Sequence, residues 1–68
     1  MERIKVTSSN VNSVGYSNGV LEVHFKSNLI YQYKNVPEFL FVQLLRTSSK
    51  GRFLKQHIES RYETKKIM

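Results

Sequence analysis

The sequence predicts an α+β domain in which a small antiparallel β-meander of three to four strands is packed by two C-terminal helices. Apolar and polar residues alternate through much of the first half of the chain, as in half-buried strands. From about residue 38 onward, apolar residues recur at helical spacing instead. Strands followed by helices are typical of α+β folds. The whole chain, residues 1–68, is short enough to be one domain.

Four stretches of the first half have the pattern of strands. They are residues 3–7, residues 13–16 as a short edge strand, residues 20–25 and the return strand 29–36. Asn18-Gly19 predicts a hairpin turn between the second and third of these stretches, because both residues tolerate positive φ. Asn28 predicts a second turn in which it takes the left-handed conformation.

The second half predicts two helices. Pro37 suits the first position of a helix, and Phe41, Leu44 and Leu45 follow at helical spacing as core residues. This helix should end near Arg46. The second helix is predicted from about residue 50 to residue 62, with an apolar stripe of Phe53, Leu54, His57, Ile58 and Tyr62. The basic tail, residues 63–68, is either a last strand or a frayed end.

Composition narrows the possible functions. Eleven basic and five acidic residues give a net charge of +6, which favours polyanionic partners such as nucleic acid or nucleotides; a solvated, soluble surface is the alternative. The absence of cysteine excludes disulfides and thiolate metal sites, and we expect neither a metal nor another cofactor. We see no membrane span or signal peptide and expect a cytoplasmic protein that does not associate with membranes. A small core makes a homo-oligomer a further expectation.

The order of short motifs along the chain resembles the KTSC domain family, a small domain found alone and at the C-terminus of some lysyl-tRNA synthetases. The resemblance covers about residues 6–62. The motifs that carry it are Ser8-Ser9, Val14-Gly15-Tyr16, Leu21-Glu22-Val23-His24-Phe25, Tyr31-Gln32-Tyr33, Val36-Pro37, Leu44-Leu45, Ser49-Lys50-Gly51-Arg52-Phe53 and Ile58. Asn28 and Thr47 depart from the family pattern, which tends to have glycine and alanine there. The resemblance implies a non-enzymatic domain that contacts RNA. The size resembles that of a phage-encoded or small bacterial accessory protein, which would place a phage protein in the host cytoplasm.

The segment between the two predicted helices is the first candidate site. A helix N-terminus presents free N–H groups and a partial positive charge to an anion. Ser48 and Ser49 add hydroxyl groups, Gly51 allows a ligand to approach the backbone, and Lys50 and Arg52 add positive charge. The alternative is an ordinary helix start that Ser48 or Ser49 caps by itself.

Aromatic and basic side chains extend this candidate site. Tyr31 and Tyr33 share one strand face, where they either stack on bases or belong to the core. Basic residues crowd the second half and form either a phosphate-binding patch or a solvated face: Arg46, Lys50, Arg52, Lys55, Arg61, Lys65 and Lys66. The two histidines, His24 and His57, are predicted to be packed or surface residues without a metal.

Three functions remain open at this point. The first is a binding module for a phosphate-bearing ligand, most of all RNA. The second is a homo-oligomeric, phage-type protein that sequesters a nucleotide immune signal, such as a cyclic nucleotide or an ADP-ribose derivative, between subunits. The third is a protein-interaction module, for which Ile30 or Leu40 would be exposed apolar contacts. No paired carboxylates or activated nucleophile can be identified, so we do not expect an enzyme.

Overall fold

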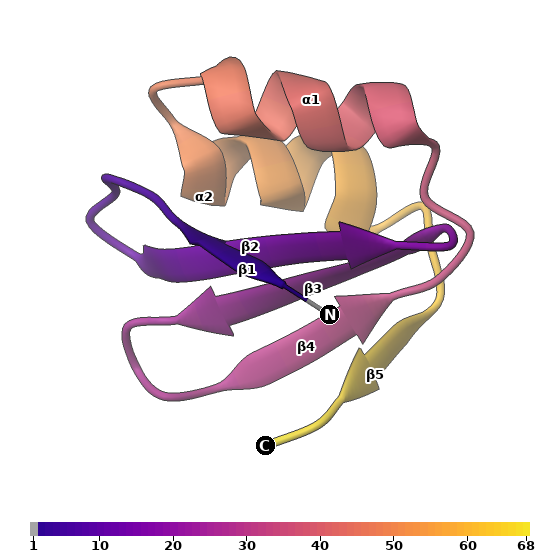
Figure 1. Ribbon diagram of the computed structural model, residues 1–68, viewed down its shortest axis with the longest axis horizontal. Helices are drawn as coiled ribbons and strands as arrows, with labels where there is room; N and C mark the ends of the chain where they lie inside the picture. Colours follow the sequence, from indigo (N-terminus) through magenta and orange to yellow (C-terminus); the bar gives the residue numbers. More distant parts are fainter. Residues whose placement is uncertain (1) are drawn as a thin grey trace.

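The computed structural model describes residues 2–68. The elements follow in the order β1 (Arg3–Lys5), β2 (Val11–Ser17), β3 (Val20–Phe25), β4 (Ile30–Tyr33), α1 (Glu38–Arg46), α2 (Lys50–Phe53), η1 (Leu54–Glu59) and β5 (Thr64–Lys66). The five strands form one antiparallel sheet in the order β1-β2-β3-β4-β5, and the helices cover one of its faces (Figure 1). The predicted α+β meander with two C-terminal helices is therefore confirmed, with five strands in place of three to four.

The position of β2 differs from the prediction. Residues 13–16 were expected to be an edge strand, whereas β2 is longer and lies inside the sheet, between β1 and β3. The edges are instead β1 and β5, each three residues long. The tail beyond residue 63 thus forms a strand, because β4 offers a free edge on the side away from β3.

Asparagine residues form the tight turns. Asn18, Asn28 and Asn35 have positive φ angles of 51°, 70° and 60°. Asparagine tolerates this region better than other non-glycine residues do. The predicted hairpin at Asn18-Gly19 and the left-handed Asn28 are both confirmed by these angles.

The core lies between the sheet and the helices. Val14, Leu21, Val23 and Tyr33 are buried from the sheet side. From the helix side the buried apolar residues are Leu40, Leu44, Leu54 and Ile58. The predicted core residues Phe41, Leu45 and Phe53 are half-buried and pack against this cluster. Leu40 and Ile30, expected to be exposed apolar contacts, are both buried, so that expectation was wrong.

The sheet face away from the helices is polar. Arg3 Nε donates to Glu22 Oε2 at 2.6 Å, and Gln32 Nε2 donates to Glu22 Oε1 at 2.9 Å, so one row of side chains crosses β1, β3 and β4. Glu22 is buried beneath these two partners. The hydrogen bond from Gln32 lowers the pKa of Glu22 most; burial opposes this effect, and Arg3 adds to it.

The helices begin and end close to the predicted positions, with differences at the start of the first helix and at the end of the second. Pro37, predicted as the first helical residue, is instead the N-cap residue, and α1 begins one residue later at Glu38. The second helix begins at Lys50 as predicted, but it ends at Glu59 rather than near residue 62 and continues from α2 into the π-helical η1. His57, predicted on the apolar stripe, is exposed and lies against Phe53, with 4.8 Å between ring centroids. No helix within residues 2–68 combines the length and the hydropathy that a bilayer span requires.

Candidate functional site

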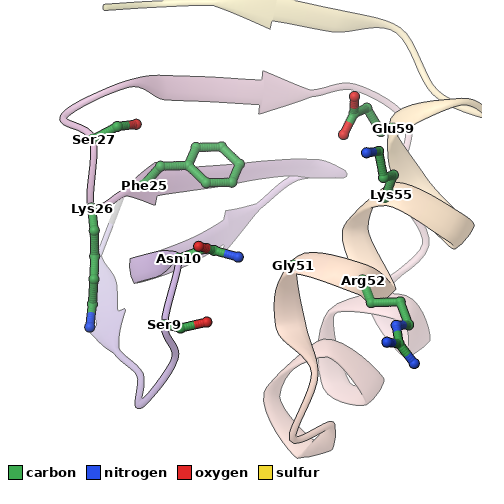
Figure 2. Close-up of a pocket in the computed structure, with 9 residues that line it drawn as sticks. All are labelled: Ser9, Asn10, Phe25, Lys26, Ser27, Gly51, Arg52, Lys55 and Glu59. Carbon is green, nitrogen blue, oxygen red and sulfur yellow. The ribbon is translucent and has the colours of Figure 1, made fainter.

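A groove of about 580 Å³ lies between the second helix and two loops of the sheet. Ser9 and Asn10 contribute from the β1–β2 loop, and Phe25, Lys26 and Ser27 from the end of β3 and the turn after it. The helical side consists of Gly51, Arg52, Lys55 and Glu59. Figure 2 shows the Phe25 ring between these two sides. The groove therefore combines residues that are far apart in the sequence.

One backbone hydrogen bond joins the two sheet loops, and side-chain hydrogen bonds order the β1–β2 loop. The Lys26 amide donates to the Asn10 carbonyl oxygen at 2.8 Å. The Ser8 hydroxyl accepts hydrogen bonds from the amides of Asn10 and Val11, both at 3.2 Å. Serine at this position favours such a turn because its side chain satisfies backbone donors locally. The polar side of the groove is consequently fixed to the sheet.

Gly51 has a packing role that the sequence did not reveal. A Cβ atom at this position would lie 3.1 Å from Asn10 Nδ2, so the lack of a side chain lets the helix approach the β1–β2 loop closely. The predicted reason for this glycine was the approach of a ligand, whereas the group that approaches it here is the Asn10 side chain (Figure 2).

Lys50 is not available in the groove. Its side chain is buried, and Nζ donates to the carbonyl oxygens of Thr47 at 2.7 Å and Leu45 at 3.5 Å. A cation at this place satisfies carbonyl groups that the end of α1 leaves without helical partners. Lys50 thus joins the two helices, and the role of phosphate ligand predicted for it does not fit this position.

The serines before the second helix do not cap it with their side chains. Ser49 is the N-cap residue, but its side chain makes no capping hydrogen bond; its carbonyl oxygen accepts from the Phe53 amide at 2.9 Å. Ser48 and Ser49 are both exposed and lie outside the groove lining. The predicted capping of the second helix by the side chain of Ser48 or Ser49 is therefore wrong.

The two tyrosines of β4 face the helices. Tyr33 is buried in the core, as the alternative interpretation had it. Burial, the nearby negative charge of Glu59 and Tyr31 together raise the pKa of Tyr33 to about 12. Tyr31 is half-buried and meets Phe25 edge to face, with 5.7 Å between ring centroids. Tyr31 thus packs against Phe25 and does not itself line the groove.

The structure brings only part of the predicted site together. Gly51, Arg52 and Lys55 line the groove, whereas Arg46 and Arg61 are exposed outside its lining. The groove residues that sequence reasoning missed are Ser9, Asn10, Phe25, Lys26, Ser27 and Glu59. The basic-polar sequence Lys26-Ser27 in a turn was a usable signal for part of this set. Within residues 2–68, no three His, Asp or Glu side chains gather into a candidate metal site.

The arrangement suits a ligand that is both anionic and aromatic. Lys26, Arg52 and Lys55 supply three cations, and Glu59 supplies one carboxylate. Phe25 supplies an aromatic ring to the same groove, while Asn10 and the serines add hydrogen-bonding groups. Phosphate groups pair with cations and bases stack on aromatic rings.

Comparison with known proteins identifies the family. The model of the KTSC domain matches residues 7–62. This chain belongs to the KTSC domain family. The crystal structure of a KTSC domain protein from Yersinia pestis superimposes with a TM-score of 0.92 at 36% identity and covers 98% of this chain and 97% of the other. An uncharacterized protein of Stutzerimonas stutzeri (strain A1501) is 38% identical over 58 residues, which is 82% of each chain.

The groove lies entirely within the part of the chain that defines the KTSC domain. Its lining runs from Ser9 to Glu59, inside the matched residues 7–62. Strand β5 falls outside the matched segment, although it completes the sheet beside β4.

Proposed function

We propose that this KTSC domain is a non-enzymatic binding module for phosphate-bearing ligands, and that its main ligand is single-stranded RNA bound in the groove. The observation that supports the proposal is that Lys26, Arg52 and Lys55 line one groove together with an aromatic ring, Phe25. Cations of this kind follow a phosphate backbone, and an aromatic ring accepts a base by stacking. The net charge of +6 favours the same partner over long range.

The groove is a better candidate than the open face of the sheet. The open face carries cations such as Arg3 and Lys5, but the aromatic side chains of β3 and β4 pack on the helix side instead. Sheets that bind single-stranded RNA typically present aromatic rings on their exposed face. Because this open face has polar residues in those positions, base stacking is expected at the groove.

The proposal is tested by fluorescence anisotropy with a labelled single-stranded RNA of roughly eight nucleotides, a length in the range that small binding domains cover. We expect binding that weakens steeply as salt increases. The double variant Lys26→Ala/Arg52→Ala should bind more weakly and should reduce the slope of log K against log salt by about 1.4, because each lost phosphate contact contributes about 0.7.

The matched control removes two cations elsewhere. Lys5 and Lys65 are exposed on the terminal strands β1 and β5 and do not line the groove, so Lys5→Ala/Lys65→Ala makes the same change in net charge. This control should leave the salt slope unchanged. Equal losses in the two double variants would mean that only net charge matters, and absence of binding at low salt by a folded protein would refute the proposal.

A small nucleotide is the second candidate ligand, because the groove volume of about 580 Å³ lies in the range of small-molecule pockets. In this second proposal, the protein is a homo-oligomer that sequesters a nucleotide signal. Size-exclusion chromatography with light scattering, together with identification of any nucleotide released on denaturation, separates the two candidates. A defined oligomer that releases a nucleotide would favour sequestration, and a monomer that binds RNA would favour the first proposal.

A further inference from the structure

Glu59 is unexpected in a groove for phosphates. It is the one acidic side chain among the nine described residues of the lining. Neither ion pair of residues 2–68 includes it, and none of the side-chain hydrogen bonds in that part of the chain uses its carboxylate. A carboxylate repels phosphate, so in an RNA groove it is suited to a different part of the nucleotide.

Lys55 lies one helical turn before Glu59. Figure 2 shows both side chains projecting from the helix toward the side of the groove where Phe25 lies. Lys55 offers N–H donors and Glu59 offers two acceptor oxygens. A base that stacks on Phe25 would thus present its edge to one donor group followed by one pair of acceptors.

Guanine is the base whose edge is complementary to this pair. Its Watson–Crick edge has one acceptor, O6, followed by two adjacent donors, N1–H and the N2 amino group. A carboxylate accepts from both donors at once, as it does in other bidentate pairs, and an ammonium group donates to O6. Adenine, cytosine and uracil each have a single donor group on this edge, and each would also place an acceptor against the carboxylate.

We infer that the groove is selective for guanine, with Glu59 and Lys55 binding the Watson–Crick edge of a base stacked on Phe25. This inference rests on the proposed function and specifies the nucleotide that the groove prefers. Lys26 and Arg52 then bind the neighbouring phosphates. Figure 2 draws Lys26 on the sheet side of the groove and Arg52 on the helix side, with both charged ends directed away from the Phe25 ring, so these cations suit phosphates beside the stacked base rather than the base itself.

The test compares short RNAs that differ at one position. A uridine oligomer of roughly eight nucleotides is compared with oligomers in which one central uridine is replaced by guanosine, inosine, adenosine or cytidine. We expect the guanosine oligomer to bind about tenfold or more tightly than the all-uridine, adenosine and cytidine oligomers, in line with a good bidentate contact. Inosine, which lacks the N2 amino group, should be intermediate.

The variant Glu59→Gln separates the base contact from general RNA binding. Glu59 is exposed, so folding is not affected. The variant should lose the guanosine preference, so that the guanosine oligomer binds no more tightly than the all-uridine oligomer. Glu2→Gln makes the same charge change at an exposed residue outside the groove and should keep the preference.

The outcomes of these measurements distinguish guanine selectivity from the RNA binding on which it rests. Equal affinity for all five oligomers, or a guanosine preference that survives Glu59→Gln, would overturn guanine selectivity and leave RNA binding standing. Absence of binding to every oligomer at low salt would refute both.

Discussion

Asn10 and Gly51 hold the β1–β2 loop against the second helix at a separation that leaves little room for a Cβ atom. The nearest atom to such a Cβ would be Asn10 Nδ2 at 3.1 Å, whereas the Asn10 Cβ and Cγ atoms lie at 3.8 and 3.9 Å. Only the mobile end of an exposed side chain is therefore in the way.

Gly51→Ala is expected to raise the free energy of unfolding by about 0.5 kcal/mol. Alanine is favoured over glycine in a helix by about 1 kcal/mol, and displacing the Asn10 amide offsets part of this gain. Chemical denaturation measures the change. In an Asn10→Ala background the same substitution should give the full gain of about 1 kcal/mol, and destabilisation in both backgrounds would contradict this account.

Lys50→Met is expected to lower the free energy of unfolding by about 1–3 kcal/mol, because it leaves the carbonyl oxygen of Thr47 without the buried ammonium donor. Urea denaturation measures this loss, and Lys55→Met, at an exposed position, is the control that should change stability little. In RNA titrations the order of the two effects should be reversed, with Lys55→Met showing the larger change. Lys50→Met should keep the wild-type affinity, because its ammonium group is buried outside the groove, and Lys55→Met should bind more weakly; weaker binding by folded Lys50→Met would return that residue to the binding site.

The strands were predictable because each depends on a local pattern. Residues 20–25 alternate, and β3 covers the same residues. The place of a strand within the sheet depends on its partners, which is why β2 could not be recognised as an interior strand. The π-helical segment was also hidden, because Leu54 and Ile58 have a spacing that fits an α-helix equally well.

The groove was predictable only on its helical side. Arg52 and Lys55 lie near a glycine and two serines, a local signal, whereas Asn10 and Phe25 join them through folding of distant segments. The sequence also shows the charge of Lys50 without showing that its carbonyl partners bury it. Positive charge alone therefore led to the prediction that Lys50 binds phosphate. It gave no reason to include Lys26, which lies on the opposite side of the groove.

The stability of the protein is expected to fall on acidification below about pH 4.5, in part because of Glu22. Its pKa in the folded protein lies below the ordinary value of 4.5, so the unfolded chain takes up a proton first as the pH falls. The stabilisation is present above pH 4.5 and is lost as the pH passes through the lowered pKa. Glu22→Gln should flatten the acid limb of the stability curve, measured by denaturation at several pH values. Glu2→Gln should not, and an unchanged acid limb in Glu22→Gln would refute this assignment.

An alkaline loss of stability is expected between about pH 10 and about pH 12 from Tyr33. The pKa of this residue rises from 10.0 to about 12 in the folded protein, so the unfolded chain releases the proton first. The stabilisation is present below pH 10 and disappears as the pH rises through about 12. The free energy of unfolding of Tyr33→Phe should decline less steeply over this pH interval than that of the wild type. Because Glu59 contributes to the shift, Glu59→Gln should move the phenolate absorbance titration of Tyr33 to lower pH, and an unmoved titration would contradict the contact.

The π-helical segment makes this part of the chain tolerant of changes in length during evolution. Each hydrogen bond of a π-helix encloses one more residue than an α-helical bond does. Loss of exposed Gln56 or His57 would let the segment relax to an ordinary α-helix and would bring Leu54 and Ile58 from four to three positions apart. Residues three apart share a helix face, as residues four apart do, and the same holds for Lys55 and Glu59. A lineage can therefore lose one residue here while it keeps both its core and its groove.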